Sequence, residues 1–156
     1  MNEIVKVRPL SLADFEFIGK LASRVRRYTA PSPYVLWMLS RFHGEWSAVA
    51  EDARTRLGYL LAFPVSGSSI FVWQLACTSK GQRLRAPDAL ASYLKGLMIR
   101  GRYQQLRFTT VPGTATERAL GGIAQRVFKS PAHKQTKLPD EASHVEWEYV
   151  IDFDST

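Results

Sequence analysis

Cysteine is almost absent from this 156-residue sequence, which contains only Cys77. A single cysteine cannot form an internal disulfide, and it excludes any metal site built from several cysteines. The three histidines and the carboxylates also lack the spacing of a metal site, so we expect no bound metal. Cys77 lies in an apolar stretch, where a cysteine is usually a small core residue rather than a nucleophile.

Long apolar runs are missing as well. The longest ones, "YLLAFPV" and "IFVWQLAC", are far shorter than the roughly 20 residues that a membrane-spanning helix needs. The first residues, "MNEIVKVRPL", have no apolar stretch of the kind found in signal peptides. We therefore expect a cytoplasmic protein that does not enter a membrane.

Acidic residues are outnumbered, with 14 Asp and Glu against 21 Lys and Arg and a net charge of +7. Such an excess suits a polyanionic partner: a nucleic acid, a coenzyme or a membrane surface. The alternative is an arginine-rich solvated surface with no such partner. The apolar fraction of 46% is enough for a complete core. The length and the absence of repeats predict one domain spanning residues 1–156.

Apolar periodicity predicts the elements of the fold. Strands are predicted at residues 4–10, 46–52, 56–65, 70–77, 104–111 and 145–153, and helices at 12–27, 34–42, 88–100 and 114–128. The strand at 70–77 is apolar throughout, which predicts burial on both faces. The polar, proline-containing stretch 129–144 is predicted to be a long loop. This order, β-α-α-β-β-β-α-β-α-β, indicates an α/β fold with a central mixed sheet and helices on both faces.

Smaller signals refine these elements. Ser11 and Asp14 have the spacing of a capping box at the start of the first helix. Leu90, Leu94, Leu97 and Met98 are predicted to face the core from the helix at 88–100. The adjacent glycines at 121 and 122 predict a weak point in the last helix.

The turn after the strand at 70–77 is basic. It reads "TSKGQRLRAP" and contains one glycine, Gly81, followed by Arg83 and Arg85. Coenzyme-binding folds often place a glycine-rich turn here, because its N–H groups and the following helix end bind pyrophosphate. The turn could be a phosphate site that uses arginines, a site for another polyanion, or an ordinary basic loop.

Four segments occur in an order that resembles the GNAT superfamily of N-acyltransferases: "VRPLSLADF", "PSPYVLWML", "IFVWQLACTSKGQRLRAPDAL" and "LRFTTVPGTATERAL". The last three look most like the diaminobutyrate acetyltransferases of ectoine biosynthesis. The likeness covers about residues 4–128, and "FVWQLA" is its most distinctive part. It implies the GNAT fold, acetyl-CoA or another acyl-CoA as donor, and a small amine as acceptor. Homodimers occur among such relatives.

The resemblance also implies roles for individual residues. Tyr34 and Trp73 would form the amine pocket, and His144 and Glu146 would handle the proton of the amine. The backbone of Leu75, Ala76 and Cys77 would stabilise the acyl oxygen at an opened edge of the strand. The donor would be bound by Lys80, Gln82, Arg83, Arg85 and Thr114. The alternative interpretation makes Tyr34 and Trp73 core aromatics, and makes His144 and Glu146 features of a strand edge.

The chain departs from that family at several positions. Gln82 stands where the family's loop has arginine, and Arg83 and Arg85 replace two glycines of its phosphate loop. Gly121 occupies the position of a tyrosine that protonates the leaving group, and Thr29 that of an acidic residue that binds the substrate ammonium. The loss at Thr29 argues against diaminobutyrate as substrate.

The sequence therefore predicts an amide-forming N-acyltransferase with acyl-CoA as the default donor. Two alternatives stay open. The same fold could take its acyl group from aminoacyl-tRNA, which would suit the missing glycines and the positive charge. It could also be a non-catalytic domain that binds a nucleic acid or a protein.

Overall fold

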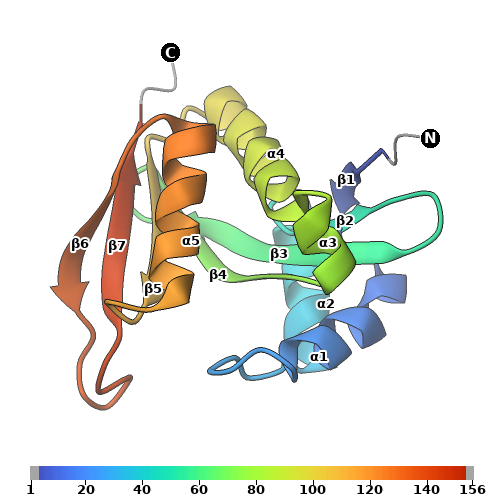
Figure 1. The fold of residues 1–156 in the computed structure, drawn as a ribbon, viewed down its shortest axis with the longest axis horizontal. Coiled ribbons are helices and arrows are strands. Elements are labelled where there is room, and N and C mark those ends of the chain that lie inside the picture. The colour runs from blue at the N-terminus through green and yellow to red at the C-terminus, as the bar shows by residue number, and fades with distance from the viewer. Residues whose placement is uncertain (1–3, 154–156) are drawn as a thin grey trace.

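The computed structural model describes residues 4–153. Within these residues, seven strands form one mixed sheet in the order β1-β2-β3-β4-β5-β7-β6 (Figure 1). The strands are β1 (Lys6–Pro9), β2 (Ala48–Glu51), β3 (Arg56–Val65), β4 (Ser69–Cys77), β5 (Gln105–Thr110), β6 (Ala132–Lys137) and β7 (Trp147–Asp152). Only β4 and β5 are parallel; the other neighbouring pairs are antiparallel. The predicted mixed α/β sheet is confirmed.

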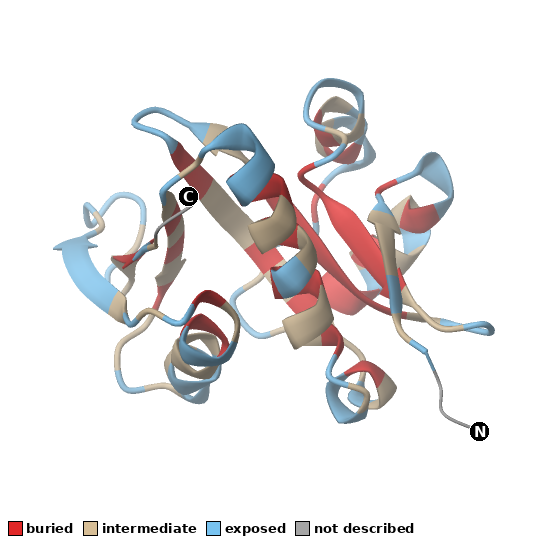
Figure 2. Cartoon of the chain, turned by 90° about the horizontal axis from the view of Figure 1, so that it is seen from above, coloured by how far each residue is buried: buried red, intermediate tan, exposed pale blue. Residues whose placement is uncertain are grey.

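Helices cover both faces of this sheet (Figures 1 and 2). They are η1 (Leu12–Asp14), α1 (Phe15–Ala22), α2 (Pro33–Phe42), α3 (Ser79–Arg83), α4 (Ala86–Gly101), α5 (Ala115–Ile123) and the π-helical turn η2 (Ala124–Phe128). α1 and α2 pack on one face, against β2, β3 and β4. α4, α5 and η2 pack on the other. The four residues of α4 predicted to face the core are buried there.

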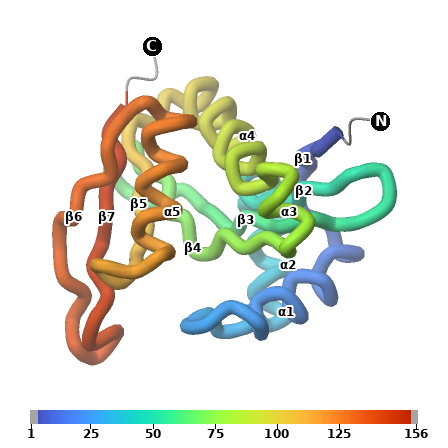
Figure 3. The backbone as a smooth tube through the Cα atoms, viewed as in Figure 1, coloured from blue at the N-terminus to red at the C-terminus, as the bar shows by residue number. Residues whose placement is uncertain are grey.

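The first helix is shorter than predicted. Its capping box is present: the Ser11 N–H donates to Asp14 Oδ2 over 2.9 Å. The helix ends at Ala22 rather than near Arg27. Residues 23–32 leave the helical path and form the loop that connects α1 to α2, as Figure 3 shows. Contacts to β4, described below, hold them there.

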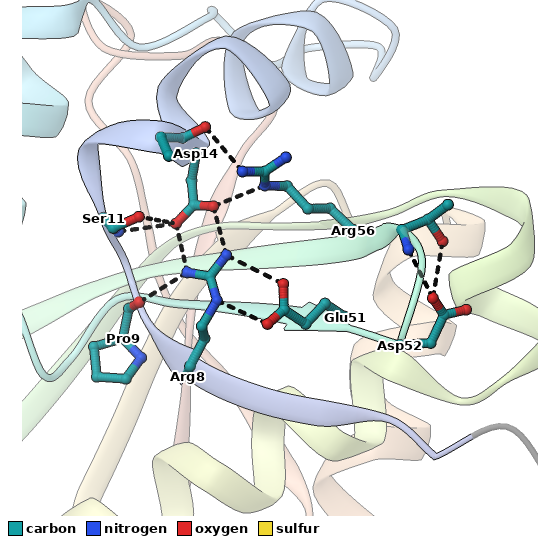
Figure 4. Close-up of polar contacts among 9 residues, drawn as sticks. Arg8, Pro9, Ser11, Asp14, Glu51, Asp52 and Arg56 are labelled. Atoms are coloured by element: carbon teal, nitrogen blue, oxygen red, sulfur yellow. Dashed lines mark hydrogen bonds and ion pairs between the residues drawn. The ribbon is translucent and has the colours of Figure 1, made fainter.

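A buried carboxylate fixes the start of this helix to the sheet (Figure 4). Asp14 is fully buried and accepts hydrogen bonds from Arg8 Nη1 and Nη2 and from Arg56 Nε, each 2.8 Å long. Arg8 also donates to Glu51 on β2. Burial alone would raise the pKa of Asp14, but the hydrogen bonds from the two guanidinium groups outweigh it and hold the pKa well below its ordinary value.

One strand was not predicted. β6 lies within the stretch 129–144, which the sequence predicted to be a long loop. It pairs with β7 alone, at the edge of the sheet, and almost all its residues are exposed (Figure 2). An edge strand needs only its backbone to pair, and its polar side chains discourage further pairing. Such a strand has no alternating apolar pattern by which the sequence could reveal it.

Candidate functional site

β4 and β5 separate part-way along the sheet. They pair only at Ser69–Gln105, Ile70–Leu106 and Phe71–Arg107. In the pairing with β3, Ala62 lies opposite Val72 and Leu61 opposite Gln74, so Trp73 is an extra residue in β4. A bulge of this kind bends its strand. The C-terminal half of β4 therefore has an open edge, and the prediction that β4 is buried on both faces is wrong: Trp73, Leu75 and Cys77 are only partly buried.

A cleft of about 1130 Å³ occupies this opening. Its walls are residues 72–77 of β4, residues 108–111 at the end of β5, residues 25–29 after α1, and the first turns of α4 and α5. Binding sites for small molecules commonly measure about 300 to 1,000 Å³. The cleft is therefore large enough for a coenzyme arm together with a small substrate.

Eight of the twelve residues predicted for the site line the cleft: Trp73, Leu75, Ala76, Cys77, Gln82, Arg85, Thr114 and Glu146. They come from β4, α3, the start of α4, the N-cap of α5 and the loop before β7. The structure thus brings together residues that lie up to 73 positions apart in the chain, from Trp73 to Glu146 (146 minus 73).

The other four, Tyr34, Lys80, Arg83 and His144, are not among the lining residues. Tyr34 is 67% exposed on α2, where its ring stacks on Trp37 with centroids 5.9 Å apart. Lys80 Nζ lies 2.7 Å from Asp52 Oδ2 and joins α3 to the turn between β2 and β3. Arg83 and His144 are exposed. Helical and loop geometry directs these side chains to other surfaces than the cleft.

The basic turn does not form an open cradle. Its residues wind into α3, capped by Thr78, whose Oγ1 accepts from the Gly81 N–H over 3.0 Å. The N–H groups of Gln82, Leu84 and Arg85 donate to carbonyl groups within the same turn. These donors are therefore occupied, whereas a glycine-rich phosphate loop leaves its N–H groups free for the ligand.

Gly81 serves packing in this turn. A Cβ added to Gly81 would lie 2.2 Å from the carbonyl oxygen of Leu57 on β3. Glycine lets α3 approach β3 closely, so its presence does not indicate a close approach to phosphate.

The start of α4 is the positive end of a long helix. Arg85 is its N-cap, in a left-handed conformation with φ of 59°, and it lines the cleft. The first-turn N–H groups of a helix have no partner within the helix, and they favour anions. Asp88 in this turn pairs with Arg126 of η2, and this hydrogen bond lowers the pKa of Asp88. The Arg85 guanidinium and the helix end therefore fit a phosphate group.

The cleft as a whole is positively charged. Among the described residues that line it, five are arginines (Arg26, Arg27, Arg85, Arg118 and Arg126) and two are acidic (Asp88 and Glu146). The Asp88–Arg126 pair neutralises one charge of each sign, so four arginines face a single carboxylate. This balance favours an anionic ligand.

Tyr28 was missed by the sequence analysis. Its hydroxyl donates to the carbonyl oxygen of Leu75 over 3.0 Å and accepts from the Leu75 N–H over 3.1 Å. Next to it, Gln74 Nε2 donates to the carbonyl oxygen of Thr29 over 2.9 Å. The available signal was a tyrosine directly before the non-helical "TAPSP", but its partner lies 47 residues away.

Cys77 lines the cleft without being activated. Burial raises the pKa of its thiol to about 12, so the reactive thiolate is scarce near neutral pH. Among residues 4–153, no group of three His, Cys, Asp or Glu side chains is arranged to hold a metal ion. In the same residues, no helix has the length and apolar character needed to span a bilayer.

No protein-family model and no curated protein sequence matches the chain. Solved structures do match over almost the whole length. Diaminobutyrate acetyltransferase EctA from Paenibacillus lautus, in complex with L-2,4-diaminobutyric acid and coenzyme A, has 21% identity and a TM-score of 0.80, covering 97% of this chain and 96% of that one.

Two further structures support the same fold. Ard1 from Thermoplasma volcanium has 15% identity and a TM-score of 0.79, with 96% and 99% of the two chains covered. The PaiA N-acetyltransferase from Thermoplasma acidophilum, in complex with coenzyme A, has 9% identity, a TM-score of 0.68 and the same coverage. With its separated β4 and β5 strands and a helix end facing the gap, the chain has the GNAT fold that its sequence resembles.

Proposed function

We propose that this chain is an N-acyltransferase that forms an amide between an activated acyl group and a primary amine of a small substrate. The observation that carries the proposal is the open edge of β4 beyond Phe71, in a cleft large enough for a donor and an acceptor. The similar structures with bound coenzyme A support it.

Amide formation requires an uncharged amine, a donor for the developing oxyanion, and a leaving group that takes up a proton. The backbone N–H of Leu75 lies on the open edge and is the proposed oxyanion donor. Trp73 lines the cleft and is partly buried, and an indole ring at such a site can hold an ammonium group before it loses its proton.

Glu146 is the proposed acceptor of that proton. It lines the same cleft as Trp73 and is only partly buried, so it is accessible to an amine bound there. The new C–N bond then replaces the bond to the donor. The nitrogen loses two protons in all: the first passes from the ammonium group through Glu146 to solvent, and the second, lost as the amide forms, goes to the leaving group.

Acyl-CoA is the default donor, and its thioester would supply the activated acyl carbon. Arg85 and the first turn of α4 would hold its phosphates, with Gln82 beside them. Thr114, the N-cap of α5, also lines the cleft and is the other residue proposed to contact the donor. The phosphates would be bound by a guanidinium group and a helix end instead of a loop cradle.

Aminoacyl-tRNA is the second candidate donor. Two observations favour it: the N–H groups of the basic turn are used within α3, and Arg26, Arg27 and Arg118 extend the positive surface beyond the phosphate site at α4. A ribose-phosphate backbone would use such distributed arginines, and its binding would weaken steeply as salt rises.

Thermal stability and turnover in the presence of each donor test the proposal. Saturating acetyl-CoA should raise the melting temperature by about 5 °C or more. Arg85→Ala should weaken the binding of acetyl-CoA about tenfold or more, because a charged hydrogen bond is lost. Arg83→Ala is the matched control, since it removes the same charge from the same turn outside the cleft and should leave binding almost unchanged.

The same measurements distinguish the two candidate donors, acyl-CoA and aminoacyl-tRNA. Turnover with aminoacyl-tRNA, together with no stabilisation by acetyl-CoA, would select the second candidate. If neither donor supports transfer to any of a panel of amines, and Trp73→Ala changes only the stability, the transferase proposal is contradicted.

A further inference from the structure

The N–H and C=O groups of Leu75 point outward from the open edge of β4, where β5 no longer pairs with it. Both groups are bound by one atom, the Oη of Tyr28, at 3.1 and 3.0 Å. The phenol thus takes the place of the missing neighbouring strand. In the described chain, the proposed oxyanion donor is already occupied by a protein side chain.

Two contacts hold Tyr28 in this position. Its neighbour Thr29 accepts a hydrogen bond from Gln74 Nε2. Gln74 is buried at 2% exposure, and its own oxygen accepts from the Tyr59 hydroxyl over 2.9 Å. The segment 23–32 is therefore fastened to β4 at two successive residues, Gln74 and Leu75.

The backbone just before Tyr28 is strained. Arg27 has φ of 76°, in the left-handed region that residues other than glycine seldom adopt. Opening of the segment would release this strain, which offsets part of the loss of the hydrogen bonds to β4. The closed segment is thus opposed by strain in its own backbone.

The occupied N–H conflicts with its proposed role, because its single proton is directed at the Tyr28 oxygen and cannot also be directed at an acyl oxygen. We propose that Tyr28 closes the acyl site of this enzyme. Its hydroxyl occupies the Leu75 N–H until the carbonyl oxygen of an acyl donor displaces it and the segment 23–32 opens. This inference rests on the proposed function.

A competing role for Tyr28 is that of a proton donor to the leaving group. Among the described residues that line the cleft, Tyr28 carries the only phenol, and burial raises its pKa. In the closed arrangement, however, its proton is already donated to the Leu75 carbonyl. The two roles make opposite predictions for Tyr28→Phe, which keeps the ring and removes the hydroxyl.

Amide hydrogen exchange, measured by NMR without any donor, tests the closed state first. In Tyr28→Phe, the Leu75 amide should exchange about tenfold faster than in the wild type, because it has lost its acceptor. Other β4 amides should keep their rates. Tyr93→Phe is the matched control: it removes a phenol that donates to the Glu45 carbonyl over 2.8 Å, outside the cleft. Unchanged exchange at Leu75 in Tyr28→Phe would overturn the proposal.

Comparison of acetyl-CoA with coenzyme A, by calorimetric titration, tests the displacement. Both molecules carry the two amide carbonyl groups of the pantetheine arm, and acetyl-CoA alone adds the thioester carbonyl group that is proposed to use the Leu75 N–H. The ratio of the affinity for acetyl-CoA to the affinity for coenzyme A should therefore increase about two- to tenfold in Tyr28→Phe, the range of one hydrogen bond. The same ratio should stay constant in Tyr93→Phe.

Three results would count against displacement. An unchanged ratio of the two affinities overturns it. A fall in kcat of Tyr28→Phe by a hundredfold with unchanged affinities assigns the proton-donor role instead. If the wild type binds neither acetyl-CoA nor coenzyme A, the use of coenzyme A is contradicted, and so is its displacement of Tyr28. The exchange rate of the Leu75 amide then still shows whether Tyr28 closes the edge of β4.

Discussion

Arg126 binds the carboxylate of Asp88 through two nitrogens, with Nε 2.9 Å from Oδ2 and Nη2 3.0 Å from Oδ1. This pair joins the first turn of α4 to η2 at the edge of the cleft. A Cβ at Gly122 would lie 2.7 Å from Arg126 Nη1, so the glycine leaves room for the guanidinium group. Arg126 thus neutralises the negative charge of Asp88 at the helix end that is proposed to bind phosphate.

Removal of Arg126 should therefore weaken donor binding. We expect Arg126→Ala to lower the affinity for acetyl-CoA about two- to fivefold, because the freed Asp88 carboxylate repels phosphate at the start of α4. The double variant Asp88→Asn/Arg126→Ala should recover most of the loss. Calorimetric titration measures both, and additive effects of the two substitutions would contradict the coupling.

Substitution of Gly81 should destabilise the fold. Gly81→Ala places a Cβ 2.2 Å from the Leu57 carbonyl oxygen, and we expect a loss of about 1–3 kcal/mol in the free energy of unfolding. Gly121→Ala is the control, because no atom outside the local helix lies within 4 Å of its added Cβ. That variant should gain up to about 1 kcal/mol from helix propensity. Urea unfolding of both variants measures the contrast.

The stability of the protein should fall in acid through Asp14. Its pKa in the folded state lies below the ordinary value of 3.8, so its contribution is complete well above pH 4 and declines as the pH falls below that value. Asp14→Asn should cost on the order of 3 kcal/mol at pH 7, since it removes the buried carboxylate charge that accepts hydrogen bonds from two partly exposed guanidinium groups. The difference in the free energy of unfolding between the variant and the wild type should decrease steadily below pH 4. A constant difference in urea unfolding from pH 7 to pH 3 would contradict this assignment.

The thiol of Cys77 should be dispensable for turnover. Burial raises its pKa to about 12, so very little thiolate exists at pH 7.5 to act as a nucleophile. We expect Cys77→Ala to keep the wild-type kcat within about twofold, and iodoacetamide to modify the folded protein slowly. Initial rates and mass spectrometry provide the measurements. Loss of turnover in a variant with a normal melting temperature would restore the nucleophile interpretation.

Much of the fold is determined by local patterns in the sequence. The apolar spacing of α4 and the alternation in β7 required no knowledge of distant residues, because each element must bury one face. The Ser11–Asp14 capping box acts within four residues and was likewise predictable. β6 was not, because an exposed edge strand is recruited by β7 through backbone pairing alone.

The site was predictable only in part. The resemblance placed Trp73, Leu75, Arg85 and Glu146, and the structure gathers them in one cleft. A motif does not specify where a side chain points, however. The exposure of Tyr34 and the engagement of Lys80 by Asp52 follow from packing that the sequence does not display.

The sequence by itself determined the order of the elements other than α3 and β6, the positive charge and the separation of apolar from polar faces, because these depend on neighbours along the chain. Only the tertiary structure decided that Trp73 is an extra residue that bends β4, and that Tyr28 takes the vacant edge at Leu75. It also decided that Arg126 neutralises Asp88, 38 residues away. Hydrogen bonds and ion pairs of this kind depend on distances in space, which residue types along the chain do not fix.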